Sequence, residues 1–242
     1  MESVLAGGSD TRIPELDVSA YQNQASYVIK REQTSTTCHS PAISPGSVRT
    51  AKFNVVDGNF LDLSSLHMTW TCNEKSNKEL IPASAIPHNW WRRLIIKVNG
   101  ATVEDINHIA RLEEQITRFT STNKRRNWGD AGTGWATLTD KGVDAISKPI
   151  AANGSVDVAW RPVSSGFLQC GKYLPLMGGA AGGLQIEIEC ADLTDAVVNA
   201  PGKSAAWELS ELKLHCDSVM LASEMTSSFA DMLISGESIL LP

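Results

Sequence analysis

The chain has 242 residues, enough for one large domain or two small ones, and its formal net charge is −6. Hydrophobic residues make up 42% of it and charged residues 20%, which excludes a disordered chain, a collagen and a coiled coil. The acidic balance excludes a general positive surface that would coat nucleic acid, and no window approaches the roughly 18–20 apolar residues of a membrane span.

The start of the chain and its cysteines indicate a protein made and kept in a reducing compartment. Residues 1–16 include an acidic Glu2 and no apolar run of signal-peptide length. The five cysteines are odd in number, widely spaced and without a C-x-x-C pair. We therefore expect buried or half-buried thiols that pack as small apolar residues.

The first 45 residues differ in composition from the rest. They are rich in Ser, Thr, Gln and Asn, their apolar residues follow no sustained period, and Pro41 and Pro45 lie at their end. This pattern predicts that residues 1–45 form an extended N-terminal arm that could become ordered on a partner.

Regular structure is predicted to begin near Val48, with about eight strands. Alternation of apolar and polar residues, as in Leu66–Cys72, is typical of a strand with one buried face. Asn99-Gly100 after such a run predicts a hairpin, and a phase slip near Ser210-Glu211 predicts a bulge. The strand candidates are residues 48–56, 60–63, 66–72, 91–98, 156–160, 172–176, 184–190 and 207–216, and residues 219–221 follow the last of them.

Two stretches change to the helical period of 3.6 residues. The first covers residues 104–120, with Thr102 and Asp105 in a spacing that resembles a capping arrangement. The second covers residues 223–234, with Met225, Phe229 and Leu233 on one face. Many strands with two isolated helices predict an all-β protein, a β-sandwich with one or two inserted or terminal helices, rather than a βαβ protein.

Motifs of catalysis and metal binding are missing from the sequence. It contains no complete P-loop, no G-x-S-x-G nucleophile elbow and no H-E-x-x-H, and its five histidines lack the short spacings of zinc ligands. Glu187 and Glu189 share one strand face and could serve acid/base chemistry, but a solvated sheet face explains them better. We therefore expect no enzyme activity, no metal and no cofactor.

Two clusters are candidates for contact with partners. Trp90 and Trp91 are adjacent, so one indole is expected in the core and the other at a surface or interface, because neighbouring strand residues face opposite ways. Arg118, Lys124, Arg125 and Arg126 lie near Trp128 and are weak nucleic-acid candidates, since cations after a helix also complement its dipole.

The order of the elements carries a family resemblance. A strand VNGATVEDI is followed by a helix NHIARLEEQITRF and a charged turn KRRNWGD. Later come FLQCGKYLPLMGG, the strand GLQIEIECADLTDAVV, then WELSELKLHCDSVML and SSFADMLISGESILLP. Over residues 48–242 this order, with phrases such as KYLPL and ADLTDAV, resembles the first jelly roll of double-jelly-roll major capsid proteins, the lineage shared by adenovirus and large DNA viruses.

The resemblance implies a jelly roll of two packed four-stranded sheets, trimeric capsomers and a shell. It names no catalytic residues. The family continues into a second jelly roll after the segment that matches ISGESILLP, where this chain stops. A second jelly roll is therefore missing, or lies on another chain, or the protein is a single-jelly-roll relative.

We therefore predict a jelly-roll domain at residues 46–222 and a helix and tail at residues 223–242. The predicted function is a structural subunit of a virion capsid, bound to copies of itself as a trimer or higher capsomer and to other capsid proteins. The arm and tail would clamp subunits together, and nucleic-acid contact would be local. The interface candidates are Trp90, Trp91, Met225, Phe229 and Leu233. The alternative is a carbohydrate- or ligand-binding β-sandwich that uses the two tryptophans with Arg92 or Arg93.

Overall fold

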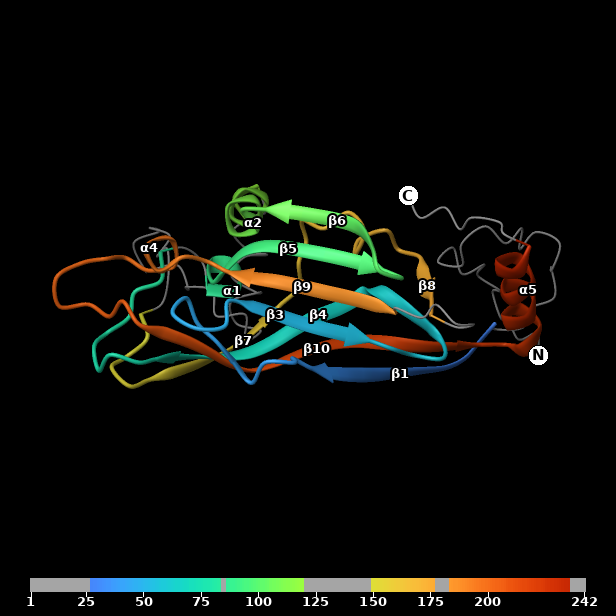
Figure 1. The fold of residues 1–242 in the computed structure, drawn as a ribbon, viewed down its shortest axis with the longest axis horizontal. Helices are drawn as coiled ribbons and strands as arrows, with labels where there is room; N and C mark the ends of the chain where they lie inside the picture. The colour runs from blue at the N-terminus through green and yellow to red at the C-terminus, as the bar shows by residue number, and fades with distance from the viewer. Residues whose placement is uncertain (1–26, 84–85, 120–148, 177–182, 236–242) are drawn as a thin grey trace, which may run out of the picture.

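Two antiparallel sheets lie face to face along the long axis of the molecule (Figure 1). The computed structural model describes residues 27–83, 86–119, 149–176 and 183–235. Sheet A follows the order β1 (Val28–Thr37), β10 (Trp207–Leu221), β4 (Phe60–Glu74) and β7 (Ser155–Trp160), with β2 (Ala42–Ile43) on β10 and β8 (Tyr173–Pro175) on β4. Sheet B follows β3 (Thr50–Val55), β9 (Leu184–Cys190), β5 (Trp91–Val98) and β6 (Ala101–Asn107).

The pairing of the main strands is nested. The first strand pairs with the last, β1 with β10, and inside that pair β3 pairs with β9. Inside those, β4 pairs with β7 and β5 with β6, and successive pairs alternate between the two sheets. An antiparallel ribbon of eight strands wrapped into a sandwich has this connectivity, which defines a jelly roll. The predicted fold class, an all-β jelly-roll sandwich, is confirmed. Among the described residues sheet B has the four strands that the resemblance implies, whereas sheet A has six because the short strands β2 and β8 join it.

The core lies between the sheets because most strands alternate strictly. In β9 every second residue from Leu184 to Cys190 is buried, and the glutamine and glutamates between them face outward. β3 shows the same pattern at its buried positions, and the inner halves of β4, β5 and β10 complete one continuous cluster. Alternation of this kind fixes the register, since a shift by one residue would turn the apolar side chains to solvent.

A second, smaller core lies at the end of the sandwich occupied by helix α5 (Ser223–Ile234) (Figure 1). The predicted helix at residues 223–234 is confirmed with these bounds. Its Phe229 ring meets the ring of Phe60 edge-on, with centroids 5.1 Å apart, among apolar side chains of β8 and β10. The helix thereby covers the end of sheet A.

The predicted turn and bulge are both present. Asn99 and Gly100 join β5 to β6 with φ values of 51° and 79°, the positive angles that a two-residue type I′ hairpin requires. In β10 the register to β4 shifts between Ser210 and Lys213, and Glu211 has a φ of 54°. This bulge returns Leu212 and Leu214 to the core after the phase slip.

The prediction that regular structure begins near Val48 is wrong. β1 begins at Val28 and pairs with β10 along its length, and Ala42–Ile43 adds the short strand β2, so this part of the predicted arm belongs to sheet A. β1 is an edge strand with most of its side chains exposed, so no apolar alternation marks it in the sequence. Residues 1–26 lie outside the described residues.

The first predicted helix is shorter than expected. Residues 101–107 form β6, and helix α2 covers only Ile109–Arg118. His108, with a φ of 56°, separates the two elements. Asp105 does not cap a helix: its carboxylate accepts two hydrogen bonds from Arg93 of β5, at 2.8 and 2.6 Å. The return of the hairpin after Asn99-Gly100 overrides the helical spacing.

Within the described residues no helix combines the length and apolarity that a membrane crossing requires. The expectation for the thiols is confirmed: Cys72, Cys190 and Cys216 are buried, and Cys38 and Cys170 are half-buried, all as free cysteines.

Candidate functional site

The tryptophan pair lies in the core. Trp90 and Trp91 are both 0% exposed, so the prediction that one indole faces a surface is wrong. Trp90 comes before β5 begins, and strand alternation therefore does not separate the two rings. Trp91 packs against Trp70 and Trp160, with centroid distances of 5.2 and 6.4 Å, and Trp90 packs at 4.9 Å against Trp207. Neither ring offers surface to a sugar or to a partner.

The apolar face of α5 is also covered by its own chain. Met225 is 5% exposed and Phe229 is 0% exposed, both in the small core beneath the helix. The side chain of Leu233 lies outside the description. The part of this face that is described is therefore used to attach α5 to the sandwich.

The basic cluster lies mostly beyond the described residues. Arg118 is the last residue of α2, and its side chain is not described. Lys124, Arg125 and Arg126 fall in residues 120–148, outside the described ranges. Local nucleic-acid contact through these residues stays a prediction.

The two strand carboxylates do not form an acid/base pair. The Glu187 carboxylate lies between Lys97 and Lys52, at 3.1 and 3.4 Å from their ammonium nitrogens. Partial burial alone would raise the pKa of Glu187, but the hydrogen bonds and charges of Lys97 and Lys52 outweigh it and lower that pKa. An ionised, doubly paired carboxylate stabilises the surface of sheet B and is poorly suited to general acid catalysis.

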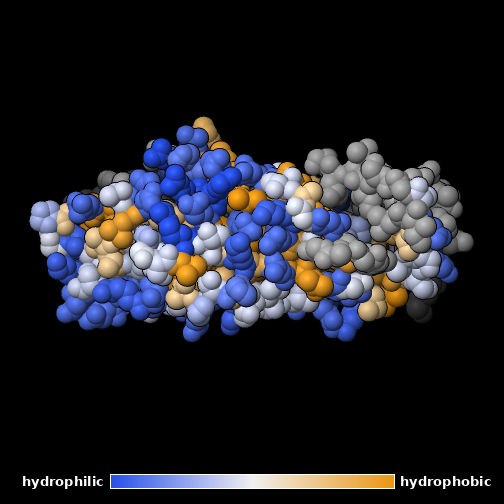
Figure 2. All heavy atoms as spheres, in the orientation of Figure 1, coloured by the Kyte–Doolittle hydropathy of each residue, from blue (hydrophilic) through white to orange (hydrophobic). Residues whose placement is uncertain are grey.

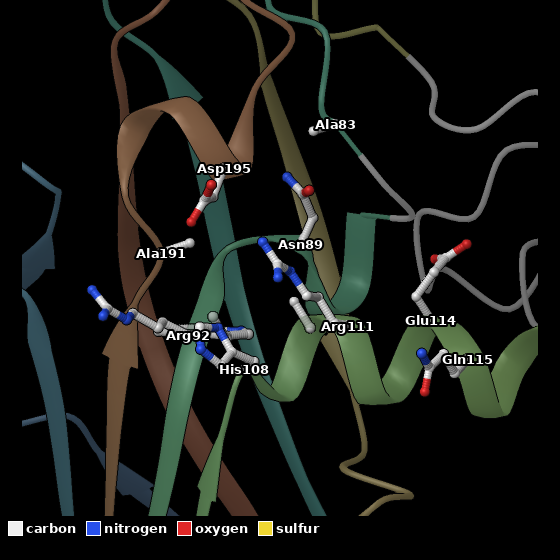
Figure 3. A pocket seen from close by; sticks show the side chains of 11 residues that line it. Ala83, Asn89, Arg92, His108, Arg111, Glu114, Gln115, Ala191 and Asp195 are labelled. Carbon is white, nitrogen blue, oxygen red and sulfur yellow. The ribbon is translucent and has the colours of Figure 1, made fainter.

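The outer surface near α2 is mostly hydrophilic (Figure 2), and a hollow opens beside this helix. The hollow has a volume of about 370 Å³ and lies between α2, α4 (Leu193–Ala196) and the start of β5, with Trp91 and Ala191 buried at its base. In Figure 3, Arg111 reaches from α2 toward Asn89, and Asp195 lies across from it. The polar side chains that line the hollow include those of His108, Arg111 and Asp195.

Helix α2 is attached to the sandwich through ionisable groups. Glu113 is buried and accepts a hydrogen bond of 2.7 Å from the backbone N–H of Ser164. Burial raises the pKa of Glu113, which the bonds from Ser164 and the charge of His88 offset only in part. The next residue, Glu114, pairs at 3.0 Å with the buried His88 of the short helix α1 (Ile86–Asn89).

A buried carboxylate joins three loops at the end of β4. Glu74 accepts hydrogen bonds from Ser76 and from the hydroxyl of Ser204 through one oxygen, and from the backbone N–H groups of Asn77 and Asn153 through the other. Desolvation would raise its pKa, but these hydrogen bonds outweigh it and lower the pKa of Glu74 to about 2. The sequence holds a signal for this residue, since Glu74 continues the buried phase of Trp70 and Cys72.

A second buried acid connects β1 to the rest of sheet A. Asp62 is buried and accepts a hydrogen bond of 2.9 Å from Arg31, whose other terminal nitrogen donates to the hydroxyl of Tyr173 at 2.8 Å. Ser64 donates to Asp62 as well. Among the described residues no group of three or more His, Cys, Asp and Glu side chains is placed to hold a metal ion.

Comparison with known proteins supports the fold. No protein-family model and no curated protein matches the sequence. The crystal structure of PBCV-1 VP54, fitted into a reconstruction of the virophage Sputnik, superposes with a TM-score of 0.53 at 13% identity, over 85% of this chain and 46% of that one. The Faustovirus major capsid protein gives a TM-score of 0.49 at 8% identity, over 88% of this chain and 58% of that one. A quasi-atomic model of the PBCV-1 virus capsid gives a TM-score of 0.48 at 10% identity, over 85% of this chain and 46% of that one.

The chain therefore spans about half the length of the solved structures it matches. Of these three structures, VP54 exceeds a TM-score of 0.5 and is the one on which the comparison of folds rests. This chain has the fold of one jelly roll of the double-jelly-roll major capsid proteins. At these identities the likeness concerns the fold alone.

Proposed function

We propose that the chain is a structural subunit of a viral capsid, located in the virion, and that it assembles through its jelly roll into capsomers and a shell. The observation that carries the proposal is the nested pairing of eight strands in a fold that superposes on VP54, a protein fitted into a virophage reconstruction. Jelly rolls also occur in lectins and cupins, so the fold alone does not decide between functions.

The buried tryptophans favour the capsid role over a carbohydrate-binding module. Such a module would need an exposed aromatic ring to stack on a sugar, and the candidates Trp90 and Trp91 are enclosed in the core. The neighbouring arginines are engaged as well: Arg92 pairs with Asp192 at 3.0 Å and Arg93 with Asp105 at 2.6 Å.

The outer face of sheet B is suited to close contact between subunits. Five of its charged side chains are paired locally, Lys52 and Lys97 with Glu187, and Arg93 with Asp105. A neighbour that packs on this face meets compensated charges instead of a field of one sign, which limits the repulsion between copies of an acidic chain.

A second jelly roll would complete the subunit. The chain spans 46% of VP54, which leaves room for a partner domain of similar size. We propose that this second jelly roll lies in the remainder of a longer protein or on another chain. Trimeric capsomers of such subunits, in contact with other capsid proteins, would form the shell.

We propose further that residues 1–26 and 236–242 act as clamps between subunits. Residue 27 lies beside the start of α5, because the backbone N–H of Ala222 donates to the carbonyl of Tyr27 at 2.9 Å, and residues 236–242 follow the other end of this helix. We propose that both segments contact the same neighbouring subunit.

Sedimentation velocity of the purified chain tests the capsid role and the clamps. The full chain is expected to form trimers or larger species in a concentration-dependent way. Deletion of residues 1–26 is expected to weaken these species while the thermal unfolding midpoint stays unchanged, since the deletion retains Tyr27 and β1. A full chain that stays monomeric at every concentration contradicts the capsid role, and unchanged assembly after the deletion contradicts the clamp alone.

A further inference from the structure

Two histidines are stacked in the middle of sheet A. His67 of β4 and His215 of β10 lie directly opposite each other in the register of these two strands. Their rings are nearly parallel, at 17°, with centroids 4.9 Å apart. Both side chains are half-buried on the outer face of the sheet. A cross-strand pair at this distance makes direct contact, so the charge of one ring acts on the other.

The hydrogen bonds of the pair show where each proton resides. Nδ1 of His67 lies 2.9 Å from the carbonyl oxygen of Ser65, which can only accept, so this nitrogen carries hydrogen. The neutral ring then gains its second proton at Nε2. Nε2 of His215 lies 2.9 Å from the hydroxyl of Thr69, which can donate to a neutral ring or accept from a charged one. Neither bond prevents protonation of the ring it holds.

The groups around the pair decide whether a second positive charge can be compensated. Within the described residues neither ring forms an ion pair with a carboxylate, and Asp217 is directed to Arg31 at 3.5 Å. Lys213, two residues before His215, adds a positive charge, and Ser35 of β1 faces His215 as a neutral neighbour. On the side of β7, Thr69 meets Ala159, a neutral neighbour, and Arg161 after the strand donates a hydrogen bond to Gln169 at 3.0 Å.

We propose that His67 and His215 form a pH-sensitive latch that holds β4 against β10 while at most one ring is charged and loosens this pairing when both are. The pair can take up one proton without conflict. A second proton places two cations in contact, and the rings must separate. Register shifts between Ser210 and Lys213 and between His215 and Asp217 leave only a short paired segment around the latch.

The direction of the pH dependence follows from the folded state. Partial burial, then the charges of His67 and Lys213, lower the pKa of His215. The folded protein therefore binds fewer protons than the unfolded chain, so stability is lost as the pH falls below about 6.5, the ordinary value for histidine. β10 also carries β1 and leads into α5, so loosening at the latch reaches the edge of sheet A.

Nuclear magnetic resonance of the ¹³C-histidine-labelled full chain tests the latch directly. The two rings are expected to titrate as a coupled pair, in two separate macroscopic steps. Independent titration of both rings near the ordinary value would overturn the proposal. This measurement uses the unaltered protein and does not depend on a variant that folds.

The thermal unfolding midpoint, measured between about pH 7.5 and 5.5, provides the second test. It compares the unaltered protein with His67→Gln and with the matched control His39→Gln. His39 is exposed and lies outside the pair. The midpoint of the unaltered protein and of the control is expected to fall with pH more steeply than that of His67→Gln. Equal slopes for all three proteins would overturn the latch. Neither outcome depends on the capsid role.

Discussion

Glu74 provides a sharp test of how the loops at the end of β4 are held together. Its two oxygens accept hydrogen bonds from Ser76, Asn77, Asn153 and Ser204. In Glu74→Gln the amide nitrogen must replace one oxygen. If the nitrogen replaces the oxygen that accepts from Asn77 and Asn153, its hydrogens point at the backbone N–H groups of these residues. Both sides then donate, and the two N–H groups lose their acceptor. The substitution keeps the size of the side chain and removes only the charge and one acceptor.

The expected loss follows from the pKa of Glu74, which falls from an ordinary 4.5 to about 2. At about 1.4 kcal/mol for each pKa unit, ionised Glu74 contributes up to about 3 kcal/mol at neutral pH. Because the hydroxyl groups can turn to new partners, we expect Glu74→Gln to lower the free energy of unfolding by about 2 kcal/mol. This contribution is complete above the ordinary pKa and disappears as the pH falls toward 2.

Urea denaturation followed by tryptophan fluorescence measures this loss at neutral and at acidic pH. The matched control is Glu208→Gln, which removes a surface ion pair with Lys75 at 2.8 Å and should cost less than about 1 kcal/mol. The difference between Glu74→Gln and the unaltered protein should narrow steadily as the pH falls below 5. A loss no larger than that of the control, or a loss that does not depend on pH, would refute the reasoning.

Three further substitutions test the packing by urea denaturation. Phe229→Ala should cost about 3–5 kcal/mol, and a cost below 1 would show that α5 does not hold the small core together. Gly183→Ala should cost at least about 2 kcal/mol, because Gly183 has a φ of 56° and a new Cβ would clash with the backbone oxygen of Val55. Its control is Gly58→Ala, which should be neutral because a Cβ at Gly58 meets open space. Arg31→Ala should cost about 2 kcal/mol by leaving buried Asp62 without its guanidinium, and no change would show that the carboxylate is satisfied without it.

Strict alternation made most of sheet B and the middle of sheet A predictable. Buried and outward-facing residues alternate along all of β9. Asn99-Gly100 predicts a type I′ turn because both residues tolerate a positive φ. The helix at residues 223–234 was predictable because its apolar side chains cover the end of a sheet and leave the other face polar.

Other elements could not be predicted because tertiary contacts decide them. β1 is polar on both faces and is a strand only because β10 supplies its hydrogen bonds. α2 buries Glu113 together with Ile109 and leaves Leu112 exposed, so its buried face matches the one that apolar spacing predicts only in part. Trp90 lies outside the strand, so alternation gave no guide to its burial.

The predicted interface residues show the same difference between what the sequence predicts and what tertiary contacts decide. The jelly roll followed from the strands and their order, whereas the surfaces through which subunits meet depend on residues with no shared pattern. Adjacent aromatic residues resemble an interface in the sequence, but Trp91 is held between Trp70 and Trp160 of sheet A.

Electron microscopy of the purified full chain tests the central claim most directly. If the chain is a capsid subunit, the images should show uniform capsomers, as trimers or larger closed assemblies, or shells built from them. Single jelly rolls that remain separate at high concentration, in a protein whose circular dichroism shows a folded β-sandwich, would contradict that claim.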